Sequence, residues 1–106
     1  MSRAFVVGEK PLIQGFKGVG FEIVHADSAD SVLTALNRLA RDPETRLVLV
    51  TESAAAENPE AVRQFRESSP AILTTIPTHM GSSHLGFKEM RKMVERSIGV
   101  DMLGKE

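Results

Sequence analysis

The chain has 106 residues and no cysteine, and its 13 basic and 14 acidic side chains leave a formal charge of −1 at pH 7. This length predicts one domain, and the lack of thiols excludes disulfides, thiolate nucleophiles and thiolate metal sites. The near-neutral charge and the five aromatic residues, all Phe, argue against a nucleic-acid partner. With no apolar run near the ~20 residues of a bilayer span and no signal peptide, we expect a cytoplasmic protein without direct membrane insertion.

The first quarter of the chain predicts a strand, a short helix and a second strand. Residues 4–7 are an apolar run typical of a buried strand, and Pro11 suits the first turn of a helix. Three glycines weaken this helix: Gly15, Gly18 and Gly20. We expect the last two to end it, because glycine lowers helix propensity by up to ~1 kcal/mol relative to Ala. Residues 21–24 alternate in polarity, which predicts an edge strand.

The middle of the chain predicts a long helix and a central strand. Asp27 or Ser28 caps the helix, and Asp42 followed by proline ends it. Its apolar stripe consists of Val32, Leu33, Leu36, Leu39 and Ala40. Residues 46–50 then form a strand in which four apolar residues follow one another without polar alternation. Such a run is typical of a strand covered on both faces, as in the centre of a parallel sheet.

The last part of the chain predicts two further helices and a fourth strand. A third helix restarts or kinks at Asn58, because a proline follows at the first helical position. Residues 70–77 predict a strand bracketed by prolines, and residues 78–86 a polar loop. Residues 87–98 show the period of an amphipathic helix.

Strand and helix alternate four times along the chain, which predicts an α/β fold. Units of roughly 20–25 residues are long enough for right-handed crossovers between parallel strands. We therefore expect a doubly wound, four-stranded parallel sheet in the order 2-1-3-4, flanked by helices. Residues 1–106 would form a single α/β domain, with the sheet core and its crossover helices in residues 1–77. The C-terminal helix and tail would occupy residues 87–106.

Polar side chains follow two neighbouring strands at the edge where ligands gather in open parallel sheets. Thr51 and Glu52 end the central strand, and Glu9 ends the first. Two carboxylates there suggest an acidic Mg²⁺ pocket, as in receiver domains, and a degenerate receiver-like or small-ligand regulatory domain is one interpretation. A receiver also needs an aspartate where Thr51 stands and a lysine near Thr78, so we favour a helix-capping or solvent-exposed role.

Other motifs give weaker indications of chemistry. The glycines close a helix instead of opening one, unlike a phosphate-binding loop. His79 and His84 lie in the polar loop without a third ligand, and neither Ser53 nor Ser83 has an identifiable base. A hydrolase or transferase that uses His79 or His84 is a weaker interpretation, because it lacks an assembled nucleophile. We therefore expect no catalytic residue, no cofactor and no metal.

The last helix has a mixed-charge face with several basic residues, which favours a solvated surface or a protein partner: Lys88, Arg91, Lys92 and Arg96.

Five segments, taken in order, resemble the F subunit of V-type and archaeal-type (A-type) rotary ATPases. They are residues 6–9, 15–20, 47–52, 70–77 and 97–101. The resemblance implies a Rossmann-like, non-catalytic central-stalk subunit of the rotor, which transmits torque and regulates ATP hydrolysis or synthesis coupled to ion transport. It also implies a place on the cytoplasmic side, peripheral to the membrane, within a membrane-attached complex.

The same resemblance implies protein partners. These are the coiled coil of the D subunit, the A/B catalytic head and the subunit that links the stalk to the membrane ring. The apolar and small polar residues left over beside the last helix stripe are the candidate contacts for the D subunit: Met93, Ser97, Met102 and Leu103.

Overall fold

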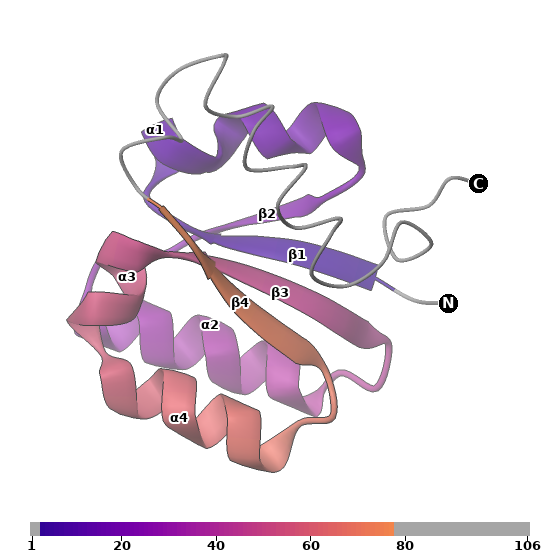
Figure 1. Ribbon diagram of the computed structural model, residues 1–106, viewed down its shortest axis with the longest axis vertical. Helices are drawn as coiled ribbons and strands as arrows, with labels where there is room; N and C mark the ends of the chain where they lie inside the picture. Colours follow the sequence, from indigo (N-terminus) through magenta and orange to yellow (C-terminus); the bar gives the residue numbers. More distant parts are fainter. Residues whose placement is uncertain (1–2, 78–106) are drawn as a thin grey trace.

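The structure of the chain, a computed structural model, describes residues 3–77, apart from the side chains of residues 17–19. Strands alternate with helices along this part of the chain (Figure 1). The elements are β1 (Arg3–Gly8), α1 (Lys10–Ile13), the 3₁₀ helix η1 (Gln14–Val19), β2 (Glu22–His25), α2 (Ala29–Arg41), β3 (Thr45–Thr51), α3 (Glu52–Glu57), α4 (Pro59–Ser68) and β4 (Ile72–Ile76). The predicted loop 78–86 and helix 87–98 lie outside the described residues.

The four strands form one parallel sheet in the order β2-β1-β3-β4, which confirms the predicted fold class and strand order. Val6 of β1 pairs with Ile23 of β2 on one side and with Leu49 of β3 on the other. The chain therefore winds outward from β1 to β2 and, after crossing back, outward from β3 to β4. The direction of winding changes between β1 and β3, at the centre of the sheet.

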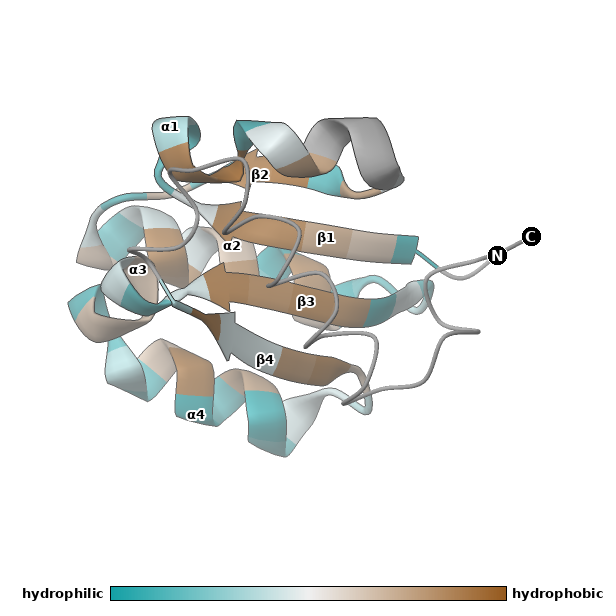
Figure 2. Cartoon of the chain, turned by 45° about the horizontal axis from the view of Figure 1, so that its top comes forward, coloured by the Kyte–Doolittle hydropathy of each residue, from teal (hydrophilic) through white to brown (hydrophobic). Residues whose placement is uncertain are grey.

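Side chains on the two faces of the sheet form two separate cores. On one face α2, α3 and α4 pack over the strands, and the core includes Val48, Val50 and Phe65. On the other face α1 and η1 cover β1 and β2, and the core includes Leu47 and Leu49. The apolar colour of β1 and β3 contrasts with the polar outer surfaces of the helices in Figure 2. The expectation that the central strand is apolar on both faces is confirmed.

The segment between β1 and β2 differs in part from the expectation. One α-helical turn, α1, is followed by six residues of 3₁₀ helix, and Gly18 lies within that helix instead of ending it. Gly20 is the residue that ends η1, with a left-handed φ of 96°. Helices of the 3₁₀ type are frequent at the ends of α-helices and as connectors, and η1 leads from α1 to the turn before β2. At the end of η1, the positive φ of Gly20 favours a residue without Cβ.

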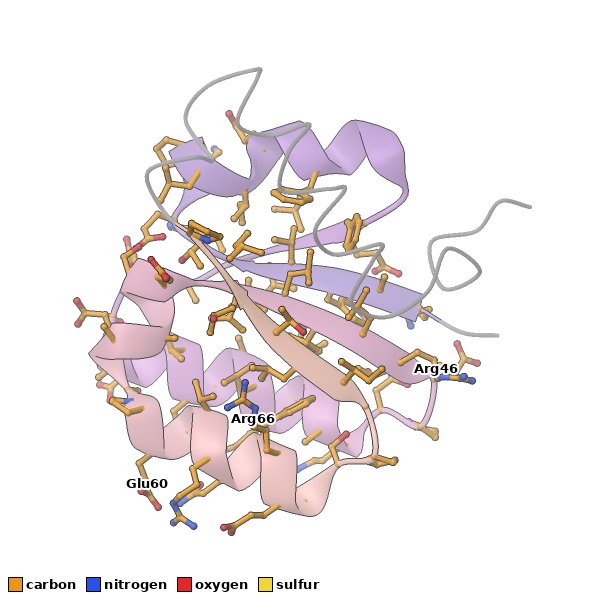
Figure 3. The ribbon with its side chains drawn as sticks, viewed as in Figure 1. Arg46, Glu60 and Arg66 are labelled. Carbon is orange, nitrogen blue, oxygen red and sulfur yellow. The ribbon has the colours of Figure 1, made fainter. Side chains whose placement is uncertain are left out.

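Polar side chains begin the two long helices at the predicted places. Ser28 caps α2, and the backbone N–H of Ser28 donates a hydrogen bond to Ser31 Oγ at 3.0 Å. Asn58 caps α4 by accepting the N–H of Ala61 at 3.1 Å, so the helix does restart there. At the other end of α4, Arg66 reaches toward β4 and donates to the carbonyl of Leu73 at 3.2 Å, whereas Glu60 points outward (Figure 3).

Within residues 3–77, no helix has the length and apolar character that a membrane span requires.

Replacement of Gly20 by alanine tests the requirement at the end of η1. A Cβ there meets no atom within 4 Å, so the cost comes from the left-handed backbone conformation alone. We expect Gly20→Ala to lower the free energy of unfolding by about 1 kcal/mol in urea titrations. Gly15, exposed and without a positive φ, is the control. Gly15→Ala should leave stability unchanged or raise it slightly, and equal losses in the two variants would contradict this account.

Candidate functional site

The centre of the sheet, where the winding direction changes, is the place at which open α/β folds bind ligands. At the carboxyl ends of β1 and β3 this chain has Glu9, directly after β1, and Thr51, the last residue of β3. The helices that follow these strands, α1 and α3, begin at the same edge (Figure 1). A binding or catalytic site would therefore be expected at this edge of the sheet.

Hydrogen bonds from two hydroxyl groups hold the carboxylate of Glu9. Thr51 Oγ1 donates to Glu9 Oε1 at 2.8 Å, and Ser53 Oγ donates to Glu9 Oε2 at 2.5 Å. Thr51 Oγ1 also accepts the backbone N–H of Ala54 at 3.2 Å and so caps α3. We call these three residues, Glu9, Thr51 and Ser53, the strand-end cluster. It joins the end of β1 to the turn between β3 and α3.

Close packing at Gly8 brings the two strand ends together. A Cβ on Gly8 would lie 2.5 Å from Cγ2 and 2.7 Å from Oγ1 of Thr51. Real Cβ atoms do not approach other atoms so closely, so any side chain at this position would force Thr51 away. Thr51 itself is 1% exposed, which leaves the residue almost no access to solvent. Glycine at position 8 is therefore a condition for the hydrogen bond between Thr51 and Glu9.

The ionised form of Glu9 is favoured in the fold. Burial raises the pKa of Glu9, but hydrogen bonds from Ser53, from its own backbone N–H and from Thr51, together with the nearby His25, more than offset that effect. The net pKa lies below the ordinary value of 4.5. A carboxyl that acts as a general acid at neutral pH would need a raised pKa. The carboxylate is instead a fixed acceptor that stabilises the junction of the strands.

The two acidic residues singled out in the sequence have different surroundings. Glu52 is exposed and is the first residue of α3, whereas Glu9 is half-buried and held by hydroxyls. The capping role expected for the end of β3 is confirmed for Thr51. Ser53, the partner of Glu9, was missed, because hydroxyl-bearing residues at helix starts are too common to signal a contact 44 positions away.

Other candidate residues do not gather at this edge within the part of the chain that is described. Across residues 3–77 no group of three or more His, Asp or Glu side chains could hold a metal ion. The members of the strand-end cluster resemble a capping network more than a binding pocket. His79 and His84, and the proposed contacts Met93, Ser97, Met102 and Leu103, lie outside the described residues.

Replacement of Glu9 by glutamine tests the role of the carboxylate. Glutamine cannot accept both hydroxyls with the strength of an ionised group, so Glu9→Gln should lower the free energy of unfolding by about 1–2 kcal/mol at pH 7. Because the pKa of Glu9 is lowered in the fold, the wild-type contribution is present above 4.5 and is lost as the pH falls through the folded value. Urea titrations between pH 7 and 3 should show the difference between the two proteins shrinking toward acid pH.

Glu52→Gln is the matched control for this experiment. Glu52 is exposed in the first turn of α3, so its replacement should cost at most about 0.5 kcal/mol through the helix dipole. A Glu9→Gln protein as stable as wild type at pH 7, or a difference that grows toward acid pH, would contradict a structural role for the Glu9 carboxylate.

Comparisons of the sequence with a family model and with individual proteins point to the same family. The model of the family described as ATP synthase (F/14-kDa) subunit matches residues 4–94. A V-type ATP synthase F subunit of Fusobacterium nucleatum is 29% identical over 100 residues, which are 93% of each chain. A V-type ATP synthase F subunit of Clostridium perfringens is 26% identical over 99 residues, 92% of each chain. Because the family match extends over most of the sequence, the chain belongs to the family of the ATP synthase (F/14-kDa) subunit.

Proposed function

We propose that this chain is a non-catalytic central-stalk subunit of a V-type or A-type rotary ATPase. The observation that carries the proposal is the family match over residues 4–94, together with two relatives named as F subunits of V-type ATP synthases over almost their whole length. In this role the chain turns with the rotor and contributes to torque transmission and to the regulation of ATP hydrolysis or synthesis. The complex couples those reactions to ion transport.

The strand-end cluster supports a binding role over a catalytic one. Both oxygens of Glu9 accept hydroxyls of the chain itself, and Thr51 caps a helix, so these polar groups are used in holding two strands together. A rotor subunit needs this kind of rigidity, because force applied at one surface must reach another without deforming the domain. Rigid parallel sheets with two apolar cores meet that requirement.

The partners we propose are protein subunits. The D subunit, a coiled coil, is the principal one, and the A/B head and the subunit that joins the stalk to the membrane ring are further candidates. Met93, Ser97, Met102 and Leu103 are proposed contacts for the D subunit, since the sequence places them on or beyond an amphipathic segment. The assembled protein would lie on the cytoplasmic side, peripheral to the membrane.

Co-expression with the D subunit of the same organism tests the proposal. We expect the two chains to purify as a stable one-to-one complex, and truncation after Gly99 to weaken it at least tenfold in calorimetric titrations. That truncation removes Met102 and Leu103 while retaining all of residues 3–77. A wild-type chain that fails to bind the D subunit would overturn the partner, and undiminished binding by the truncated chain would overturn the contacts in the tail.

The non-catalytic role has its own test. The purified chain should hydrolyse ATP no faster than a buffer blank, while an A/B/D complex should change its ATPase rate when the chain is added. The double variant Glu9→Gln/Glu52→Gln removes both acids at the strand ends and is the comparison for any residual activity. Hydrolysis by the isolated wild-type chain that this variant abolishes would contradict a purely binding role.

A further inference from the structure

The two outermost strands of the described sheet, β2 and β4, differ in charge. β2 carries Glu22, which Arg3 pairs at 2.7 Å, and ends in His25. β4 has the sequence Ile-Leu-Thr-Thr-Ile and no charged side chain. Natural proteins blunt the edges of their sheets with charged side chains, prolines or bulges, because the free N–H and C=O groups of an edge can pair with another strand. β4 itself contains neither a charge nor a proline.

The side chains of β4 favour pairing with a further strand. Ile72 is 41% exposed, and Thr75, on the opposite face of the strand, is exposed as well. Four of the five residues of β4 are Ile or Thr, which are enriched in strands. Pro70 and Pro77 flank the strand and limit its length, because proline has no N–H for a ladder hydrogen bond. The strand between them combines a high tendency to pair with no repulsive charge of its own.

Helix α4 supplies a charge to this strand. Among the strands, α4 packs chiefly against β4, and in both Figure 1 and Figure 2 it lies beyond β4 at this end of the sheet. Arg66 of its last turn donates to the main-chain carbonyl of Leu73 at 3.2 Å (Figure 3). The guanidinium therefore occupies a backbone acceptor of the outer strand. Any strand that paired there would have to break this hydrogen bond and bury a cation, and burial of an unpaired charge is costly.

We propose that Arg66 keeps the outer edge of β4 from pairing with β4 of a second copy of this chain. A second copy fits because two identical edges can pair antiparallel about a twofold axis, where each strand meets the same sequence. Ile72 and Thr75 carry no charge that would repel their symmetry mates, whereas the two copies of Arg66 would be like charges. Within residues 3–77, no strand other than β3 pairs with β4. The inference is independent of the proposed function, because it concerns copies of this chain alone.

Removal of the guanidinium tests the inference. Arg66→Met keeps a long side chain of similar helix propensity but removes the charge and the hydrogen-bond donors. In sedimentation velocity experiments on the full chain, wild type should be a monomer. Arg66→Met should have an association constant at least tenfold higher than that of wild type.

Arg63→Met is the matched control for this variant. Arg63 lies one turn earlier on α4, is exposed, and bonds with Glu60 and Glu67 instead of β4. Its replacement causes the same change in net charge and adds the same apolar side chain to the same helix. Arg63→Met should associate within twofold of wild type.

A charge placed on the strand itself should reverse the effect. The double variant Arg66→Met/Thr75→Lys carries a lysine on the edge strand and should return to the monomer, because like charges on paired strands repel. Arg66→Met/Asn37→Lys is the control, since Asn37 is exposed on α2, away from β4. It should associate as strongly as Arg66→Met. Thermal melts followed by circular dichroism check that each variant is folded.

The opposite results would overturn the inference. A folded Arg66→Met protein that stays monomeric would show that Arg66 does not guard the edge of β4, whether another segment of the chain covers that edge or nothing pairs with it. Equal association of Arg63→Met and Arg66→Met would assign the effect to net charge. Association that Thr75→Lys does not reverse, or that occurs only in unfolded protein, would place the contact outside β4.

Discussion

The burial of β3 on both faces is the constraint on which the rest of the structure depends. Leu47, Val48, Leu49 and Val50 are each 0% exposed, and they alternate between two separate cores. At about 1.5–3 kcal/mol for each fully buried aliphatic side chain, this strand outweighs any single polar contact in the domain. It must lie at the centre of the sheet with helices on both sides, so β1 and β4 become its neighbours and β2 is left at an edge.

The polar groups at the end of β3 follow from the same constraint. The strand delivers Thr51 to the sheet edge with almost no access to solvent, where a hydroxyl must find partners inside the protein. Glu9 supplies an acceptor and Ala54 a donor, and Gly8 leaves the room that this contact needs. The place where related folds bind ligands is thereby used for internal support.

Sequence reasoning predicted the features that depend on local pattern. The order of the strands, the cap at Ser28 and the restart of the helix at Asn58 all follow from periodicity and capping chemistry, and the structure confirms them. Features that depend on distant contacts were missed or only partly found. The hydrogen bond from Ser53 to Glu9 joins residues 44 positions apart, and no pattern marks either side chain for it. The position of α2 across the sheet, where it packs against β1, α3 and α4, is likewise not determined by the amphipathic stripe of the helix.

The central claim is that the carboxyl ends of β1 and β3 are closed by the chain's own side chains, which agrees with the binding role proposed above. The most direct measurement is an NMR titration of the full chain with Mg²⁺ and with ATP, followed at the backbone amides of Gly8, Glu9 and Ser53. We predict no saturable change in these resonances up to millimolar concentrations, because the Glu9 carboxylate already accepts two hydroxyl hydrogen bonds. Saturable shifts at these amides with either ligand would contradict the account.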